Sequence, residues 1–153
     1  MKTTCGIFLY VVDTKQILLV HATHAPITQW SIPKGELEEE DTPLKRALIE
    51  LREETNIDLE YLSSFVHPLG TVIYEKNKQK QLMGFALLVK SSYLAGVTVQ
   101  CNSLVNNLFP EVDGFAWLSL KVAKKMMHES QRKLLPILEE KIKAGEIKLK
   151  YSV

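Results

Sequence analysis

Glu50, Glu53 and Glu54 lie close together in the segment ELREE. On an α-helix, positions i, i+3 and i+4 share one face, so these three carboxylates would converge on a single patch. Like charges at this spacing destabilise a helix by roughly a few tenths of a kcal/mol per pair. A hard cation such as Mg²⁺ or Mn²⁺ prefers oxygen ligands and keeps several waters, so it would offset this repulsion. A divalent metal site with room for a phosphate is therefore one interpretation.

A second interpretation stays open, in which the same glutamates form a solvated helix face. Lys45, Arg46 and Arg52 lie in the same segment and can neutralise its charge. The spacing of the glutamates does not decide between the two. The preceding segment WSIPKG at residues 30–35 favours the metal site, because its Pro and Gly break the chain directly before the helix. This break places backbone carbonyls and Lys34 at the N-terminal end of the helix.

The helix that must position these glutamates has clear local signals. Asp41 or Thr42 can cap its N-terminus, and Pro43 fits its first turn. One buried stripe at helical spacing is formed by Leu44, Leu48, Leu51 and Thr55. These features predict a helix of about 13 residues.

The rest of the chain has the pattern of strands followed by a helical tail. Residues 5–12 and 16–21 predict two antiparallel strands, and residues 63–75 and 81–90 predict two more around a polar turn. Residues 115–120 predict a last strand, and 97–101 predict a short strand or an edge. Helical segments are expected at 120–129 and at 131–143, with Pro136 as a break or kink. The expected class is α/β (α+β).

Length and composition limit the number of domains and the classes of partner. The chain has 153 residues, of which 46% are hydrophobic and 24% charged, and its formal net charge is +1. Such a chain buries about 70% of its unfolded surface, so a metal would serve function rather than folding. One domain over residues 1–153 is expected. The near-zero charge gives no overall field towards nucleic acid or an anionic membrane, so recognition must come from a local site.

The cysteines and the N-terminal residues indicate a cytoplasmic protein. Cys5 and Cys101 are far apart, with no CxxC and no Cys/His cluster at zinc spacing, which favours free thiols in a reducing compartment. The apolar run GIFLYVV is stopped by Asp13 and Lys15, so it is better interpreted as a first strand than as a signal peptide. No apolar stretch approaches the ~18 residues needed to span a bilayer.

Residues 35–57 resemble the signature of the Nudix hydrolases. That signature is a Gly, five residues, a Glu, seven residues, then Arg-Glu, an aliphatic residue, any residue, Glu-Glu, any residue, Gly and an aliphatic residue. This chain begins the frame at Gly35 and continues in register with Glu50, Leu51, Glu53, Glu54 and Ile57. The segments at 30–35 and 109–120 are similar to small bacterial-type Nudix proteins described as nucleoside-triphosphate or dinucleoside-polyphosphate pyrophosphohydrolases.

The resemblance implies a Nudix fold, a mixed β-sheet sandwiched between α-helices with the signature as a loop–helix–loop. It also implies cleavage of a diphosphate linkage in a nucleoside diphosphate derivative. By the same resemblance, Glu50, Glu53 and Glu54 ligate Mg²⁺, for which Mn²⁺ can substitute, and the carbonyl of Gly35 contributes. A bound metal ion neutralises developing charge and lowers the pKa of a water that attacks phosphorus, which agrees with this role.

Three positions depart from the signature. Asp41 stands in place of Glu, and Asn56 in place of the Gly after the helix, where Asn also tolerates a left-handed backbone. Ile49 stands in place of the Arg, which in the family orients the helix carboxylates through charged hydrogen bonds. Arg46 lies four residues before Glu50 on the same face, and our hypothesis is that it partly replaces the missing Arg.

Several residues outside the helix are further candidates. Lys34 can contact a substrate phosphate or be solvated. Glu111, near Asp113 before the last strand, resembles the additional acid that serves Nudix enzymes as base or ligand, although a loop carboxylate is usually solvated. His21 and His24 lie at a strand end, where their spacing does not put both on one face. Two alternatives remain: one of them lines a substrate pocket, and His21 is the candidate, or both have structural roles.

Aromatic residues could hold a nucleobase. Trp30 and Trp117 are expected in the core, whereas Tyr74 and Phe85, on the strands after the helix, are the candidates for base contact.

These observations predict a cytoplasmic Nudix hydrolase that uses Mg²⁺ to cleave a pyrophosphate bond in a nucleotide by water attack. One rival is a catalytically weak Nudix domain that binds a nucleotide as a sensor, favoured by Ile49. Another is an α/β interaction domain whose acidic helix is only a solvated face. The expected partner is a nucleotide with a diphosphate group, without membrane or nucleic-acid binding, and with capped RNA left open. Specificity in this fold lies outside the signature, so the sequence does not name the nucleotide.

Overall fold

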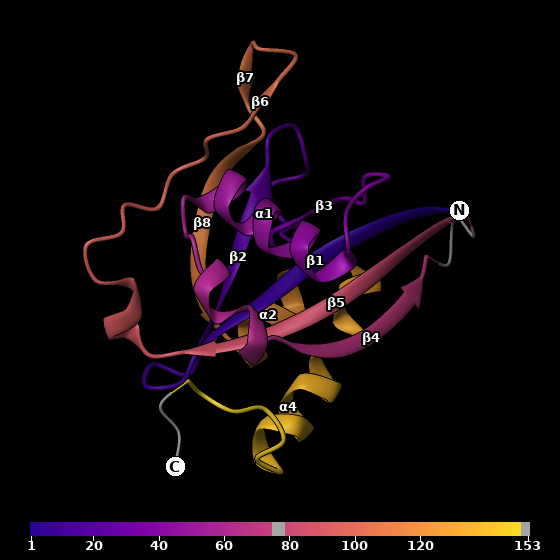
Figure 1. Cartoon of the computed structure of the whole chain (residues 1–153). Coiled ribbons are helices and arrows are strands. Elements are labelled where there is room, and N and C mark those ends of the chain that lie inside the picture. Colours follow the sequence, from indigo (N-terminus) through magenta and orange to yellow (C-terminus); the bar gives the residue numbers. More distant parts are fainter. Residues whose placement is uncertain (75–78, 151–153) are drawn as a thin grey trace.

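The computed structural model describes residues 1–74 and 79–150. Its centre is a mixed sheet with strand order β4-β5-β1-β2-β8, and a short strand, β3, pairs with β1 (Figure 1). The strand bounds are β1 Lys2–Val11, β2 Gln16–Ala22, β3 Lys34–Glu36, β4 His67–Ile73, β5 Lys80–Val89 and β8 Val112–Ser119. A separate small hairpin consists of β6 Leu104–Val105 and β7 Phe109–Pro110. β1 and β5 are parallel, and the other pairs of the sheet are antiparallel.

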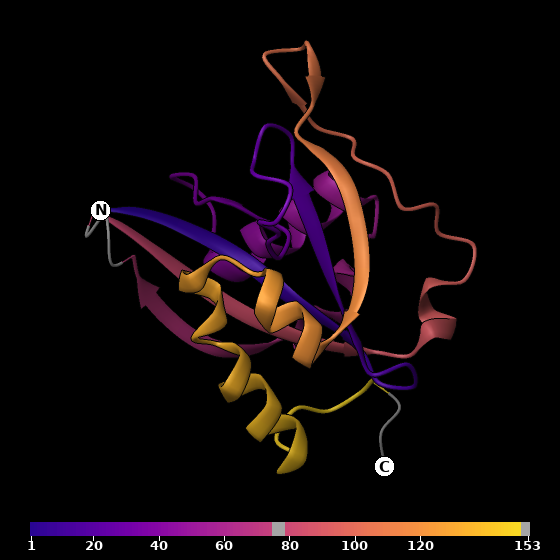
Figure 2. The same cartoon turned by 180° about the vertical axis from the view of Figure 1, so that it is seen from behind.

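Helices cover both faces of the sheet. α1 lies on one face, and the C-terminal helices lie on the other, as the two opposite views show (Figures 1 and 2). The α-helices are α1 Pro43–Thr55, α2 Leu120–Met126, α3 Glu129–Arg132 and α4 Leu135–Lys143, and the 3₁₀ helices are η1 Glu60–Phe65 and η2 Ser91–Leu94. No helix in residues 1–74 and 79–150 is both long and apolar enough to cross a membrane. The predicted sandwich of a mixed sheet between helices is confirmed.

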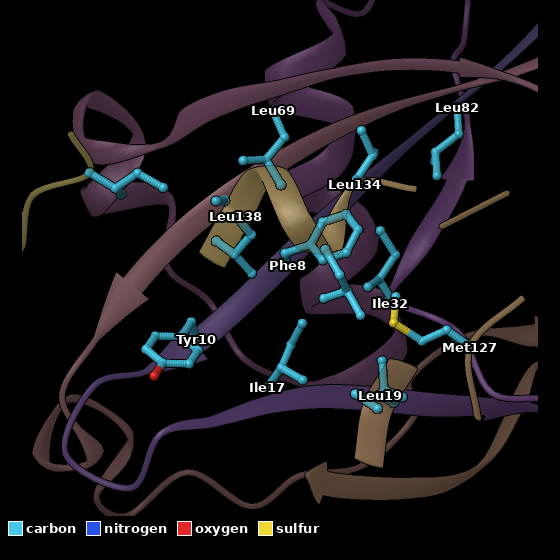
Figure 3. Packing of buried hydrophobic residues seen from close by; sticks show 14 of the residues in the cluster. Phe8, Tyr10, Ile17, Leu19, Ile32, Leu69, Leu82, Met127, Leu134 and Leu138 are labelled. Carbon is cyan, nitrogen blue, oxygen red and sulfur yellow. The ribbon is translucent and has the colours of Figure 1, made fainter. Parts of the chain in front are cut away.

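The central strand β1 is apolar on both faces because helices cover both. Phe8 packs with Leu19 and Leu134 in the cluster beneath α2 and α4 (Figure 3). Its neighbours in sequence, Ile7 and Leu9, point the opposite way and pack in a second cluster beneath α1. The two clusters hold α1 and the C-terminal helices to one sheet.

Local signals set the bounds of α1. Thr42 caps its N-terminus by accepting a hydrogen bond from the backbone N–H of Lys45 at 3.3 Å, and Pro43 begins the first turn. Asn56 ends the helix in the left-handed conformation, with φ 66°. Leu51, fully buried, lies in the stripe that packs on the sheet. The predicted helix and its stripe are confirmed, and of the two proposed caps Thr42 is the one used.

One other local prediction needs correction, because residues 97–101 form neither a strand nor an edge. The predicted break in the helical segment 131–143 is confirmed, since α3 ends at Arg132 and α4 begins at Leu135. Pro136 lies in the first turn of α4, where the N–H that Pro lacks would be unpaired anyway. The hairpin of β1 and β2 is confirmed, with Tyr10 opposite Ile17. Most of the polar turn predicted between β4 and β5 lies outside the described residues.

Candidate functional site

The site is centred on Glu50, Glu53 and Glu54, which we call the carboxylate face. Glu50 and Glu54 are buried, and Glu53 is half-buried. β3 runs beside this face because it pairs with β1, with Gly35 opposite Cys5. The backbone N–H of Lys34 donates to Oε1 of Glu54 at 3.1 Å. The sheet and α1 therefore bring the break before the helix and the helix glutamates into contact.

Gly35 lies directly against the carboxyl group of Glu50. A Cβ atom at this position would overlap the carboxyl group of Glu50. The position of the signature Gly is thus explained by the close approach of β3 to a buried carboxylate.

Arg46 links the acidic residues around α1. Its guanidinium donates to Oδ2 of Asp41 at 2.6 Å and to Oε1 of Glu50 at 3.2 Å, and it pairs with Oε2 of Glu38 at 3.2 Å. The Arg46 hydrogen bond holds the pKa of Asp41 below its usual range. Ile49, in place of the signature Arg, is half-buried. Arg46 thus makes the charged hydrogen bond to a helix carboxylate that Ile49 cannot make.

The buried carboxylates carry strongly raised pKa values. Burial raises the pKa of Glu50 to about 7, and the charges of Glu53 and Glu111 add to this. Burial also raises the pKa of Glu54 to about 8, with smaller contributions from Glu111 and Glu50, against the opposing charge of Lys34. In the metal-free chain, burial is therefore the main reason that the protonated forms of Glu50 and Glu54 are favoured.

The donor chemistry of this face fits a hard divalent cation. It consists of carboxylate oxygens beside a backbone strand, and a cation would offset the cost of burying the charged forms of Glu50 and Glu54. Oε1 of Glu50 accepts from Arg46, and Oε1 of Glu54 accepts from the Lys34 N–H. Within the described ranges, no three His, Cys, Asp or Glu side chains are close enough to hold a metal ion in the present geometry. Metal binding therefore requires the side chains to turn towards one another.

The charge of Glu111 raises the pKa of both Glu50 and Glu54, so Glu111 lies within electrostatic reach of the carboxylate face. Oε2 of Glu111 accepts a hydrogen bond from the Ser103 hydroxyl at 2.6 Å, and its backbone N–H donates to the Ser103 carbonyl at 2.9 Å. The candidate Glu111 is therefore held in place rather than loosely solvated.

His21 has a different environment. Its Nδ1 lies 2.6 Å from Oδ1 of Asp113, and its Nε2 lies 3.1 Å from the carbonyl oxygen of Pro26. The hydrogen bond with Asp113 raises the pKa of His21. Both ring nitrogens are thus engaged, and His21 does not line the cavity beside the carboxylate face. The His24 ring contacts Phe109 instead of His21.

A cavity of about 210 Å³ adjoins the carboxylate face at Lys34. Its lining residues are Ala22, Ala25, Gln29, Trp30, Ser31, Lys34, Tyr74, His128 and Gln131. The rings of Tyr74 and His128 lie 5.7 Å apart. Oε1 of Gln131 accepts from the Ile32 N–H at 2.9 Å, and Nε2 of Gln131 has no hydrogen-bond partner in residues 1–74 and 79–150. The cavity therefore offers aromatic surface and one fixed donor.

These positions change two predictions on aromatic residues. Tyr74 does line the cavity, but Phe85 is buried in the apolar cluster beneath α1 and does not. Trp30, expected only in the core, lines the cavity.

A model of the NUDIX domain matches residues 2–138. This chain belongs to the Nudix family. The match confirms the predicted family. The prediction of one domain over residues 1–153 stays a prediction.

Individual Nudix relatives are distant. The chain is 29% identical over 126 residues to a 17.7 kDa protein of the e-segB intergenic region of Enterobacteria phage T4, covering 76% of this chain and 82% of that protein. An Ap4A hydrolase of C. elegans has a TM-score of 0.71 at 20% identity, covering 94% of this chain and 99% of the other. The NUDIX domain of Shewanella oneidensis NrtR, complexed with ADP ribose, has a TM-score of 0.68 at 18% identity, covering 92% of this chain and 87% of the other. These solved structures show the shared Nudix fold.

The metal-free Nudix chain is expected to lose stability as the pH rises from about 4.5 to about 8. Glu50 and Glu54 have raised pKa values in the folded chain, from an ordinary value of 4.5, so the folded state binds more protons than the unfolded state in this window. Stability is therefore highest below the unfolded pKa and falls as the pH passes through the folded values. Mg²⁺ should raise the melting temperature at pH 8.5 much more than at pH 5. An equal shift at both pH values, at matched ionic strength, would contradict this.

Replacing Arg46 with Ala is expected to lower Mg²⁺-dependent turnover by about 10- to 100-fold, because Glu50 loses the group that orients it. Lys at this position keeps the charge without the planar fork, so it should recover part of the activity. Arg52→Ala is the matched control, since Arg52 is exposed on the same helix. Steady-state kinetics and Mg²⁺ titration measure the effect. If the loss of Arg46 changes neither the turnover rate nor the Mg²⁺ affinity, Arg46 does not orient Glu50 for catalysis.

Proposed function

We propose that this Nudix protein is a Mg²⁺-dependent hydrolase that cleaves the pyrophosphate linkage of a nucleotide by attack of water on phosphorus. The observation that carries the proposal is the position of Lys34. Its backbone N–H bonds Glu54 of the carboxylate face, while the residue also lines the adjoining cavity. A diphosphate beside Lys34 would therefore have carboxylates on one side and the cavity on the other.

Glu50, Glu53 and Glu54, with the carbonyl of Gly35, would hold the metal. When bound, Mg²⁺ supplies charge neutralisation at the phosphate oxygens and a more acidic water. The Lys34 ammonium binds and orients the phosphate as a point charge. The Glu111 carboxylate accepts the proton of the attacking water, through the oxygen that does not accept from Ser103. The water oxygen bonds to phosphorus, and the bond from phosphorus to the leaving phosphate oxygen breaks.

The cavity supports a nucleotide as substrate. Rings of Trp30, Tyr74 and His128 line it, and aromatic faces bind flat nucleobases. Nε2 of Gln131 would donate to an acceptor on the base edge, because its amide is fixed by the Ile32 N–H. The structural relatives point to the same class, since one is an Ap4A hydrolase and another is complexed with ADP ribose. We infer a nucleoside triphosphate or dinucleoside polyphosphate as the substrate class.

A nucleotide sensor is the second candidate function. The observation that favours it is Ile49, because the signature position that normally orients the carboxylates carries an aliphatic side chain. A sensor would use the same cavity and carboxylate face without turnover.

The test is a screen of nucleoside triphosphates, dinucleoside polyphosphates, nucleotide sugars and capped RNA, in which the phosphorylated products are separated from the substrate and identified. Each is measured with Mg²⁺ and with a chelator, and product analysis locates the cleaved bond. Metal-dependent turnover supports the hydrolase. Tight nucleotide binding without turnover supports the sensor, and the absence of both supports an interaction domain.

A further inference from the structure

Asn56, which departs from the Gly of the signature, has contacts that a Gly could not make. Its Nδ2 donates to the carbonyl of Thr98 at 3.0 Å, and its Oδ1 accepts from Nδ2 of Asn102 at 2.9 Å. Its backbone stays left-handed, with φ 66°, which Gly adopts without strain. The Asn at this position therefore adds two side-chain hydrogen bonds while keeping the helix end that Gly would give.

These bonds attach the segment of residues 97–103 to the last turn of α1. The backbone N–H of Gln100 donates to the Thr55 carbonyl at 3.1 Å, and that of Asn102 donates to the Glu53 carbonyl at 2.7 Å. The last carbonyls of a helix have no partner within it, so this segment satisfies them. The segment has no helix or strand hydrogen bonds of its own, so its path depends on its contacts with α1.

The same segment leads directly to Glu111. Ser103 follows Asn102, and it holds Glu111 by both its hydroxyl and its carbonyl. In Figure 1 the chain rises from η2 to the β6–β7 hairpin and returns into β8, with Glu111 between β7 and β8. Hydrogen bonds therefore join the end of α1 to Asn102, and further hydrogen bonds join its covalent neighbour Ser103 to Glu111.

We propose that Asn56 and Asn102 are positioning residues that hold Ser103, and through it the Glu111 carboxylate, at a fixed place relative to the carboxylate face. This role rests on the proposed function, in which Glu111 takes the proton from water. General-base catalysis depends on hydrogen-bond reach, so a small displacement of Glu111 lowers the rate. The cavity residues and Lys34 do not contact this segment by any hydrogen bond found in the described part of the chain, so nucleotide binding should not depend on it.

The first test measures amide hydrogen exchange, which needs no substrate. Asn56→Gly should raise exchange at the Glu111 amide by about tenfold, because that N–H is protected by the Ser103 carbonyl. Asn56→Asp keeps the acceptor for Asn102 and should give a smaller increase. Asn107→Gly is the matched control, since Asn107 is a left-handed Asn, φ 59°, on the hairpin loop. Unchanged protection of Glu111 in Asn56→Gly, or an equal loss in the control, would overturn the proposal.

The second test uses turnover of the nucleotide found by the screen. Asn56→Gly should lower kcat by about tenfold and leave KM within about twofold. In a Glu111→Gln background the same substitution should have no further effect on kcat, since it acts through Glu111. A full additional loss there would refute positioning through Glu111. If the wild-type chain turns over no nucleotide, the proposed function fails, and the exchange test still decides whether the segment is held by Asn56.

Discussion

Replacing Glu53 with Gln is expected to lower Mg²⁺-dependent turnover by about 10³-fold without destabilising the protein. Glu50 and Glu54 have protein partners, but in residues 1–74 and 79–150 the Glu53 carboxylate has neither a hydrogen bond nor an ion pair. It is also half-buried rather than buried. Glu53 is therefore the residue of the carboxylate face whose carboxylate is free to bind a cation.

The stability of the Glu53→Gln variant separates a metal role from a structural one. The Glu53 charge raises the pKa of Glu50, so removing it relieves repulsion in the metal-free chain. The melting temperature without metal at pH 8 should equal or exceed that of the wild type, whereas the shift produced by Mg²⁺ should be lost. Glu140→Gln on α4 makes the same charge change on the opposite face of the sheet and serves as control. Wild-type turnover in Glu53→Gln would remove the carboxylate face from the mechanism.

The part of the site carried by α1 could be predicted because its determinants are local. Pro43 and Thr42 start the helix, and the spacing of Glu50 from Arg46 is one helical turn, so their contact follows from geometry alone. The environment of these residues could not be predicted. That Gly35 faces Glu50 depends on the pairing of β3 with β1, which joins residues far apart in the sequence.

The nucleobase contacts were harder to predict because both faces of β5 are buried. Where one face is solvated, alternation of polar and apolar residues tells which side chains point inward, but β5 has no such alternation over most of its length. Phe85 pairs with Ile7 and points beneath α1, away from the cavity. Gln131 gave no sequence signal, since it is a polar residue in a helical tail and its partner, the N–H of Ile32, is distant in sequence.

The structure of residues 97–101 could not be predicted either, because it depends on partners that are distant in sequence. Their alternation of apolar and polar residues is typical of a strand, yet a strand forms only if its backbone finds a strand to pair with. Here the N–H groups of Gln100 and Asn102 donate to carbonyls at the end of α1. The sequence alone indicates only that Asn56 is a tolerated substitute for Gly, because its side-chain partners lie in this distant segment.

Replacing Gly35 with Ala is expected to lower kcat/KM for the Mg²⁺-dependent reaction by about 100-fold. The added methyl would occupy the space of the Glu50 carboxyl group, so that group must move away from Arg46 and from the metal position. Crowding of this kind also costs stability, by about 1–3 kcal/mol, and the melting temperature should fall. Steady-state kinetics and thermal unfolding, each with and without Mg²⁺, measure the two effects.

A double variant tests whether this loss acts through Glu50. Glu50→Asp shortens the side chain by one methylene and withdraws the carboxyl group from Gly35, so Gly35→Ala should cost much less activity and stability in that background. If the two substitutions are additive instead, the methyl acts elsewhere, for example on the pairing of β3 with β1. Non-additive loss would show that the narrow space between β3 and α1, rather than the mobility of Gly, is what the signature Gly provides.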